Sequence, residues 1–549
     1  MNCAEPAIQR LLGDLIAHDP VLATGLGLEA GAERLPSWSA SAIRRRTDCL
    51  HGHERELTGL LAADDEGAAL DAFVGLQIVR RQLREFELRR VQHRHPAAYL
   101  DVLYGLYPLL VRDFGGPGER VEALAGRLRA VPGFLEEARA GLQPGLAEPT
   151  LRAGVDGAID LLDLVGPGVR EFAAAQGLAH ALDAPSEAAC AALEGFIAWL
   201  EAELGPSAEP GGGAGRAVID DILRWEHVLD EPAESLLAYG FEVLQETREA
   251  MRELAAAMGH PDVESAVAAA QSDTPPRDGL LDAYREAVTA ARGFVAAHDI
   301  VSLPVDDELE VVATPRFLRS LTPFAAYDPP GPFAARQLGV YYVTMPDEGL
   351  GETDLAIALR SHPRSSLATT GVHEVYPGHH LQLVRANRAP TLARRIAAIL
   401  NGGSLLVEGW AFYCEELMER QGFLDDPESR LMRLNDQIWR ACRVVIDLGL
   451  HLGTMDLAGA VNYLAAEAHM NRAEAEAECR RYLEEPGQAM SYLLGKREVL
   501  RLASQWLASR GGTLRAFHDE LLTWGSLPPA VIAWGMGFGP RPAAARVTA

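Results

Sequence analysis

Residues 373–380 read His-Glu-Val-Tyr-Pro-Gly-His-His and hold three of the sixteen histidines of this 549-residue chain. Histidines grouped with a carboxylate are typical of a site that binds a metal ion and activates water. In the zincin signature, two histidines one helical turn apart bind Zn²⁺, and an adjacent glutamate acts as general base. His373 and Glu374 fit the start of that signature, but Pro377 stands where its second histidine is expected.

The second metal ligand is therefore either His379 or His380. In an unbroken helix His380 would lie roughly 10 Å further along the axis than His373, too far for two ligands about 2 Å from one ion. Pro377 removes a backbone donor and Gly378 frees the dihedral angles, so a kink is expected between them. A two-residue insertion favours His379 as ligand and leaves His380 as a neighbouring group or a donor to the substrate.

A third ligand is expected from a second helix. Glu408 lies in the apolar run Ser-Leu-Leu-Val-Glu-Gly-Trp-Ala-Phe-Tyr, residues 404–413. Burying a lone carboxylate is costly unless a positive group pairs with it, and a metal ion would provide that pairing. Glu415 and Glu416 are alternatives, although we expect both to be solvated.

Two further motifs offer groups for catalysis. Asp447 and His451 share a helix, where His451 is expected to donate to an oxyanion and Asp447 to orient a ligand or pair with an arginine; an ordinary ion pair is the alternative. Tyr492 and Lys496, four residues apart, would share a helix face, and the phenol suits donation to an oxyanion. Lys496 is the chain's only lysine, and an incidental lysine without a role in catalysis is the plainer interpretation.

The whole sequence predicts a mainly α-helical protein with a small sheet, whose strands are expected at residues 309–313 and 339–344. Its densest Gly/Pro segment, residues 206–216, predicts a linker or loop between an N-terminal helical region, residues 1–205, and a C-terminal metal-site region, residues 217–549, within one family-length unit. A net charge of −27 argues against nucleic acid or an anionic membrane as partner.

The location is predicted to be cytoplasmic. The N-terminal residues show no basic start followed by an apolar run, and no stretch of about eighteen apolar residues occurs. The six cysteines lack paired spacing, which fits reduced thiols.

Four motifs in order carry a family resemblance: His-Glu-x-x-Pro-Gly-His-His, Glu-Gly-Trp-Ala, Asp-x-Gly-x-His and Pro-Gly-Gln-Ala-x-Ser-Tyr-x-x-Gly. From about residue 5 to residue 540 the chain resembles the bacterial "domain of unknown function 885" family. That family is similar in fold to mainly helical zinc peptidases such as carboxypeptidase Taq and the oligopeptidases.

The resemblance implies a bilobed helical zincin-like metallopeptidase fold, with a small sheet beside an active-site channel and a gluzincin-like site. One zinc ion, or another divalent metal, would be bound by His373, by His379 or His380, and by Glu408. Glu374 would be the base, and Tyr492 and His451 would stabilise the tetrahedral intermediate. Strand 339–344 would resemble the edge strand that aligns an extended peptide.

We therefore expect a zinc-dependent hydrolase of amide or peptide bonds in short peptides or peptide-like metabolites. One alternative keeps the metal but assigns a small non-peptide substrate in a biosynthetic pathway. Another is a non-catalytic helical binding protein. The motifs are compatible with an exopeptidase and with an endopeptidase. They do not specify an oligomeric state.

Overall fold

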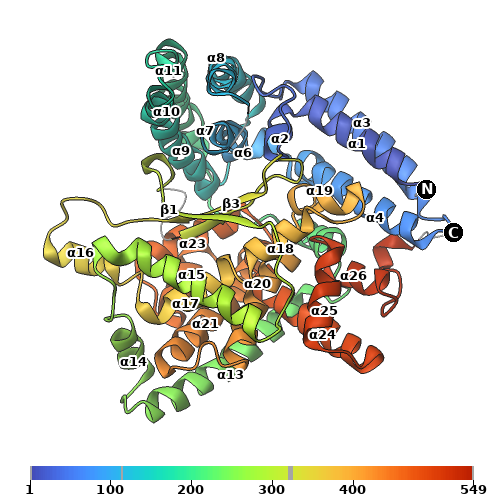
Figure 1. Cartoon of the computed structure of the whole chain (residues 1–549). Helices are drawn as coiled ribbons and strands as arrows, with labels where there is room; N and C mark the ends of the chain where they lie inside the picture. Colours follow the sequence, from blue (N-terminus) through green and yellow to red (C-terminus); the bar gives the residue numbers. More distant parts are fainter. Residues whose placement is uncertain (1–2, 113–114, 320–324, 547–549) are drawn as a thin grey trace.

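The structure, a computed structural model, describes residues 3–112, 115–319 and 325–546. Helices form almost all of its regular structure, and one three-stranded sheet lies among them (Figure 1). The mainly helical fold with a small sheet, predicted from the sequence, is confirmed.

The helices before the sheet form an N-terminal group and a middle group. The first group is α1 (Glu5–His18), α2 (Pro20–Gly25), α3 (Ala40–Leu60), α4 (Glu66–Leu83), α5 (Val91–Arg94), α6 (Pro96–Leu103), α7 (Tyr107–Val111), α8 (Pro117–Gly141), α9 (Glu148–Asp163), α10 (Val169–Ala175), α11 (Asp183–Trp199) and α12 (Arg216–Asp221). The second is α13 (Ala233–Ala257), α14 (Val263–Ala270) and α15 (Leu280–Ala297).

The helices after the sheet carry the motifs of the sequence analysis. They are α16 (Glu352–Leu359), α17 (Arg364–Glu374), α18 (His379–Ala386), α19 (Leu392–Leu400), α20 (Ser404–Arg420), α21 (Pro427–His451), α22 (Leu457–Glu467), α23 (Arg472–Glu484), α24 (Ser491–Arg510), α25 (Leu514–Leu521) and α26 (Pro529–Gly535). Asp426 caps α21 through a hydrogen bond from the backbone N of Ser429, as an aspartate at this position commonly does.

The sheet has the order β1-β3-β2. Strand β1 (Glu308–Ala313) runs parallel to β3 (Leu338–Val343), and β2 (Ala325–Asp328) runs antiparallel to it. Strands β1 and β3 match the two predicted strands within one residue. The expectation that strand 339–344 is an edge strand is wrong, because β3 is paired on both sides; β2 is the antiparallel edge.

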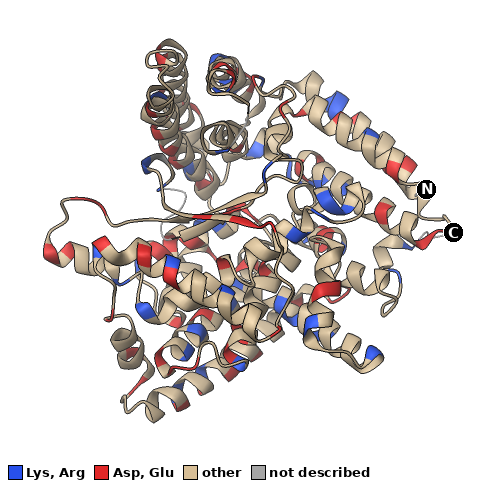
Figure 2. Cartoon of the chain, viewed as in Figure 1, with Lys and Arg blue, Asp and Glu red and all other residues tan. Residues whose placement is uncertain are grey.

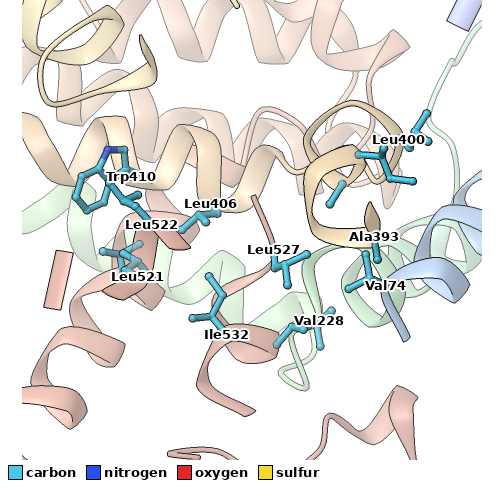
Figure 3. Packing of buried hydrophobic residues seen from close by; sticks show 14 of the residues in the cluster. Val74, Val228, Ala393, Leu400, Leu406, Trp410, Leu521, Leu522, Leu527 and Ile532 are labelled. Carbon is cyan, nitrogen blue, oxygen red and sulfur yellow. The ribbon is translucent and has the colours of Figure 1, made fainter. Parts of the chain in front are cut away.

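The largest hydrophobic cluster combines the beginning and the end of the chain. Buried side chains of α1, α3 and α4 belong to it together with those of α15, α17, α19, α20 and α24–α26. Figure 3 shows members from several of these elements, among them Val74, Ala393 and Trp410. The helices that carry the octapeptide, Glu408 and Tyr492 are therefore fixed by packing that includes the N-terminal helices, whereas α21 belongs to a separate cluster.

The Gly/Pro-rich segment packs against the end of α21. The backbone N of Ala214 donates to the Nδ1 of His451 at 3.0 Å, and the backbone N of Gly215 donates to the His451 carbonyl at 3.0 Å. The segment is thus an ordered loop, while the division of the chain at this point stays a prediction.

Helices α20 and α24 cross with their backbones in contact. A Cβ atom on Gly495 would overlap the carbonyl oxygen of Leu405, and one on Gly409 would overlap the backbone of Gly495. Glycine at both positions is what permits so close an approach. The crossing brings Glu408, next to Gly409, close to Tyr492, one turn before Gly495.

Acidic side chains outnumber basic ones along the helices, in keeping with the net charge (Figure 2). Among the described residues, no single helix has both the length and the apolar character to cross a membrane. Helices α19 and α20 pass that test only as a pair, bent by 83° at their junction.

Candidate metal centre

The octapeptide forms the break between two helices. Helix α17 ends at Glu374 and α18 begins at His379. The Tyr376–Pro377 peptide bond is cis. A Cβ atom on Gly378 would overlap the carbonyl oxygen of His373, and the indole Nε1 of Trp410 donates to the Pro377 carbonyl at 2.8 Å. The expected kink is present, and α20 holds it in place.

The break brings three ligand atoms together. The Nε2 atoms of His373 and His379 lie 3.6 and 3.4 Å from the Oε2 of Glu408. These separations exceed a good hydrogen bond but are close to the roughly 3.4 Å expected between a nitrogen and an oxygen ligand of one tetrahedral zinc ion. Among the described residues, the buried Oε2 of Glu408 has no hydrogen-bond partner. The donor set and the unpaired oxygen therefore fit a bound divalent cation.

Glu415 orients the first histidine. Its Oε1 accepts a hydrogen bond of 2.7 Å from the Nδ1 of His373, which turns Nε2 toward Glu408. A carboxylate behind a ligating histidine is a common feature of metal sites. The expectation that Glu415 is solvated is wrong, since only 1% of the residue is exposed.

The electrostatics of the cluster favour a positive charge. Burial by itself lowers the pKa of His373, but Glu408 and Glu415 outweigh this effect and raise it to about 10. Burial opposes ionisation of Glu408, yet His373 and His379 bring the pKa of its carboxyl well below the usual range. A cation between these groups is stabilised by the same carboxylates.

Glu374 lies between the cluster and the sheet edge. Its Oε2 accepts a hydrogen bond of 3.1 Å from the backbone N of Tyr327 in β2. Tyr327 is opposite Tyr341 of β3, and its N–H points away from β3. In an antiparallel ladder alternate residues direct their backbone groups outward, so Ala325 shares this free edge.

Tyr492 joins the cluster from α24. Its ring stacks on the ring of His373, with centroids 6.2 Å apart and planes at 15°. The guanidinium carbon of Arg443 lies 4.4 Å from the Tyr492 ring centroid. Burial and the charge of Glu408 raise the pKa of Tyr492, which keeps the phenol protonated and able to donate.

His380 is fully buried and belongs to a different polar group. Its Nδ1 is 2.9 Å from the hydroxyl of Tyr327, and its Nε2 is 3.6 Å from Asp307. Tyr376 also donates to Asp307. Burial opposes ionisation of Asp307, but His380 and Tyr376 lower its pKa to about 2. The structure thus places His380 behind β2 and outside the ligand cluster.

The side chains of His451 and Asp447 form hydrogen bonds with backbone groups of other segments. His451 accepts at Nδ1 from Ala214 and interacts at Nε2 with the Tyr482 carbonyl at 3.0 Å, so both ring nitrogens are engaged. Asp447 accepts from the backbone N of Gly487 and of Met490, each at 3.0 Å. The expected oxyanion role of His451 therefore lacks a free nitrogen, and the pair instead shapes the loop that leads to Tyr492.

Lys496 does not accompany Tyr492 at the cluster. It forms an ion pair with Glu416 and donates to Gln437 at 2.8 Å. Its Nζ lies 4.5 Å from the Phe412 ring centroid. Burial lowers its pKa, and Glu416 opposes that effect. The single lysine has a structural role in this buried group, and the expectation that Glu416 is solvated is wrong.

Sequence reasoning missed Asp307, Tyr327, Arg443 and the orienting role of Glu415. Glu415 had a usable signal, because it follows Glu408 by two turns on the same helix face. Asp307 and Tyr327 stand in segments without a motif, and only the fold brings them to the octapeptide.

A family model described as "Bacterial protein of unknown function (DUF885)" matches residues 20–536. The chain belongs to this family. Two solved structures share the DUF885 fold. One, from Shewanella oneidensis, has 21% identity and a TM-score of 0.79 over 96% of this chain and 98% of its own. The other, from Colwellia psychrerythraea, has 19% identity and a TM-score of 0.82 over 97% and 98%. No curated protein matches the chain.

The two solved structures are described as candidate lipoproteins, the first of them of unknown function. This finding contradicts the predicted cytoplasmic location, which is wrong. The six free cysteines are no guide to compartment here, because a chain with so large a hydrophobic core needs no disulfides in any compartment.

Proposed function

We propose that this DUF885 protein is a zinc-dependent hydrolase of amide bonds in short peptides or peptide-like molecules. The observation that carries the proposal is the spacing of the Nε2 atoms of His373 and His379, 3.6 and 3.4 Å from one unpaired oxygen of Glu408. Two histidines and a glutamate from three helices, α17, α18 and α20, form a gluzincin-like ligand set, and Glu374 directly follows the first ligand. A zincin-like, bilobed fold is part of this proposal.

Each residue has a role that its contacts support. His373, His379 and Glu408 would hold the ion, and Glu415 would fix the ring of His373. Bound zinc would supply a water of lowered pKa and polarise the substrate carbonyl. The carboxylate of Glu374 would take the proton of that water and deliver it to the leaving nitrogen. The hydroxyl of Tyr492 would donate to the carbonyl oxygen as it gains negative charge.

The free edge of β2 would bind the substrate backbone. The outward backbone groups of Ala325 and the carbonyl of Tyr327 can pair with an extended peptide, in the manner of strand addition. Tyr327 also donates to Glu374, so the substrate would lie next to the base. An extended peptide therefore suits this edge better than a compact metabolite.

Activity and metal content test the proposal separately. Purified protein loaded with zinc is incubated with a library of short peptides, and cleavage is followed by mass spectrometry. We expect Glu374→Gln to keep the zinc content of the parent and to lose at least about 100-fold in kcat/KM. Glu408→Ala is expected to lose one zinc ion per chain together with activity.

Two results would overturn the proposal: native protein without stoichiometric metal, or full activity in Glu374→Gln. A zinc-loaded protein that cleaves no peptide but consumes a small amide would favour the biosynthetic alternative.

We also infer a place outside the cytoplasm. The candidate lipoproteins with the same fold support this inference. Fractionation of cells that express the full-length gene would test it: recovery of the protein in the cytosol alone would be the contrary result.

A further inference from the structure

A second group of potential metal ligands lies between helices α1 and α3. Cys49 and His53 are one helical turn apart on α3, and Asp14 faces them from α1. These two helices pack side by side at the N-terminal edge of the fold, apart from α17 and α20 (Figure 1). The cluster is therefore independent of the candidate hydrolytic site.

The three ligand atoms are close enough to share one ion. The Asp14 Oδ2 lies 3.5 Å from the Cys49 Sγ and 2.8 Å from the His53 Nε2, and all three atoms lie within 4.8 Å of one another. Ligands of a tetrahedral zinc ion are expected about 3.6 Å apart for a sulfur–oxygen pair and about 3.4 Å for a nitrogen–oxygen pair. The first separation already matches, and the second needs a side-chain shift of about 0.6 Å.

The surroundings leave the site accessible. His53 is buried and so has a fixed position, Cys49 is half-buried, and the side chain of Asp14 is 52% exposed. An ion can thus enter from solvent and keep one coordination position for water, while the buried histidine needs no reorganisation.

We propose that Asp14, Cys49 and His53 form a second site for a divalent cation of the zinc class, which joins α1 to α3. A thiolate, an imidazole and a carboxylate suit a borderline-soft ion such as Zn²⁺ better than Mg²⁺ or Ca²⁺. With the thiolate and the carboxylate each carrying one negative charge, the bound ion is neutralised.

Binding releases one proton. The S–H bond of Cys49 breaks, a sulfur–metal bond forms, and the proton goes to solvent. His53 gives up the Nε2 proton that it donates to Asp14 and takes one up at Nδ1, so the charge of the imidazole is unchanged. Burial and the neighbouring Asp14 raise the pKa of the Cys49 thiol, so the metal-free thiol is protonated at neutral pH. Affinity is therefore expected to rise with pH.

The ion would secure the first helix. Ile8 and Leu11 of α1 are fully buried in the largest core cluster. Asp14 lies further along the same helix, and an ion pair between Arg10 and Glu56 also joins α1 to α3. A metal link would add a third, stronger connection that depends on metal supply.

Cobalt distinguishes this site from the candidate hydrolytic site, because only this cluster contains sulfur. The full-length protein with Cys3 and Cys190 changed to serine is titrated with Co²⁺, and absorption from thiolate-to-cobalt charge transfer is recorded in the near ultraviolet. We expect a band that is lost in Cys49→Ser and that persists in Glu408→Ala, where it saturates at one ion per chain.

A thiol-reactive dye supplies the second measurement. Zn²⁺ is expected to slow modification of Cys49 at least tenfold, and His53→Gln and Asp14→Asn, which keep the thiol, should each lose most of this protection. No cobalt band, a band that survives in Cys49→Ser, or a dye reaction unaffected by Zn²⁺ would overturn the proposal. The cobalt band and the dye reaction do not depend on peptide cleavage, so failure of the proposed hydrolase function would leave both measurements unchanged.

Discussion

The Nδ1 of His373 is held 2.7 Å from the Oε1 of Glu415, a carboxylate buried within the same helix, α20, that supplies Glu408. Removing its charge while keeping its shape should weaken the ligand. We expect Glu415→Gln to lower zinc affinity about 10- to 100-fold, the usual effect of disturbing a partner of a ligating histidine. Competition with a chromophoric chelator measures this change. The same substitution at exposed Glu428 serves as control, and unchanged affinity in Glu415→Gln would remove Glu415 from the site.

The two adjacent histidines of α18 should differ in metal binding. His379 is 3.4 Å from the Oε2 of Glu408, whereas His380 faces Tyr327 and Asp307. We predict that His379→Gln loses one zinc ion per chain relative to the parent and that His380→Gln keeps the zinc content of the parent, as measured by elemental analysis. The reverse pattern would assign the ligand to His380.

His380→Gln should still affect catalysis. His380 contacts the hydroxyl of Tyr327, whose backbone N donates to Glu374, so loss of the imidazole should displace the base. We expect kcat to fall about tenfold or more with little change in KM. Equal kcat in His380→Gln and the parent would show that this contact serves stability alone.

A methyl group at Gly495 should separate α20 from α24. Because a Cβ atom there would overlap the Leu405 carbonyl, Gly495→Ala is expected to cost about 3 kcal/mol of the free energy of unfolding and to weaken zinc binding. Gly293, exposed within α15, has no atom within 4 Å of an added Cβ and provides the matched control. Gly293→Ala should instead stabilise by up to about 1 kcal/mol, as urea unfolding can show.

Three buried histidines should make the protein sensitive to acid. Burial lowers the pKa of His362, His451 and His518 to about 4 in each case. Each group is neutral when folded but takes up a proton near pH 6.5 when unfolded. The contribution of these histidines to the free energy of unfolding is therefore fully present above pH 6.5. It is lost as pH falls toward 4, by about 1.4 kcal/mol per pH unit for each histidine.

Urea unfolding at several pH values measures this dependence. Between pH 6.5 and 4, the pH dependence of the unfolding free energy of His518→Gln should correspond to about one proton fewer taken up on unfolding than in the parent. His180, whose side chain is 87% exposed, is the control, and His180→Gln should keep the parent slope. An unchanged slope in His518→Gln would mean that His518 is not held neutral.

The sequence was most informative where local chemistry decides the structure. The helical periodicity and the two longer strands follow from residue pattern, and Pro377 with Gly378 predicts the break that places His379 near His373. Strand β2 has four residues and too little pattern to be recognised. The edge position expected for strand 339–344 rests on the family resemblance alone.

The roles of side chains that contact segments distant in the sequence could not be predicted from the sequence. His451 looks like a donor to substrate until the loop with Ala214 and the Tyr482 carbonyl occupy its two nitrogens. Glu415 looks solvated until the packing of α17 on α20 buries it against His373. Such assignments require tertiary contacts, which the spacing of residues along one helix does not contain.

Helix α20 contacts the octapeptide at three positions along its axis. Glu408 lies beside the two histidines, Trp410 donates a hydrogen bond to the Pro377 carbonyl, and Glu415 accepts one from His373. A rotation or slide of α20 by a single residue would break all three contacts at once. Metal occupancy would consequently report the position of α20 relative to the octapeptide. Any ligand or mutation that displaces α20 should release zinc under conditions in which the chain is still folded.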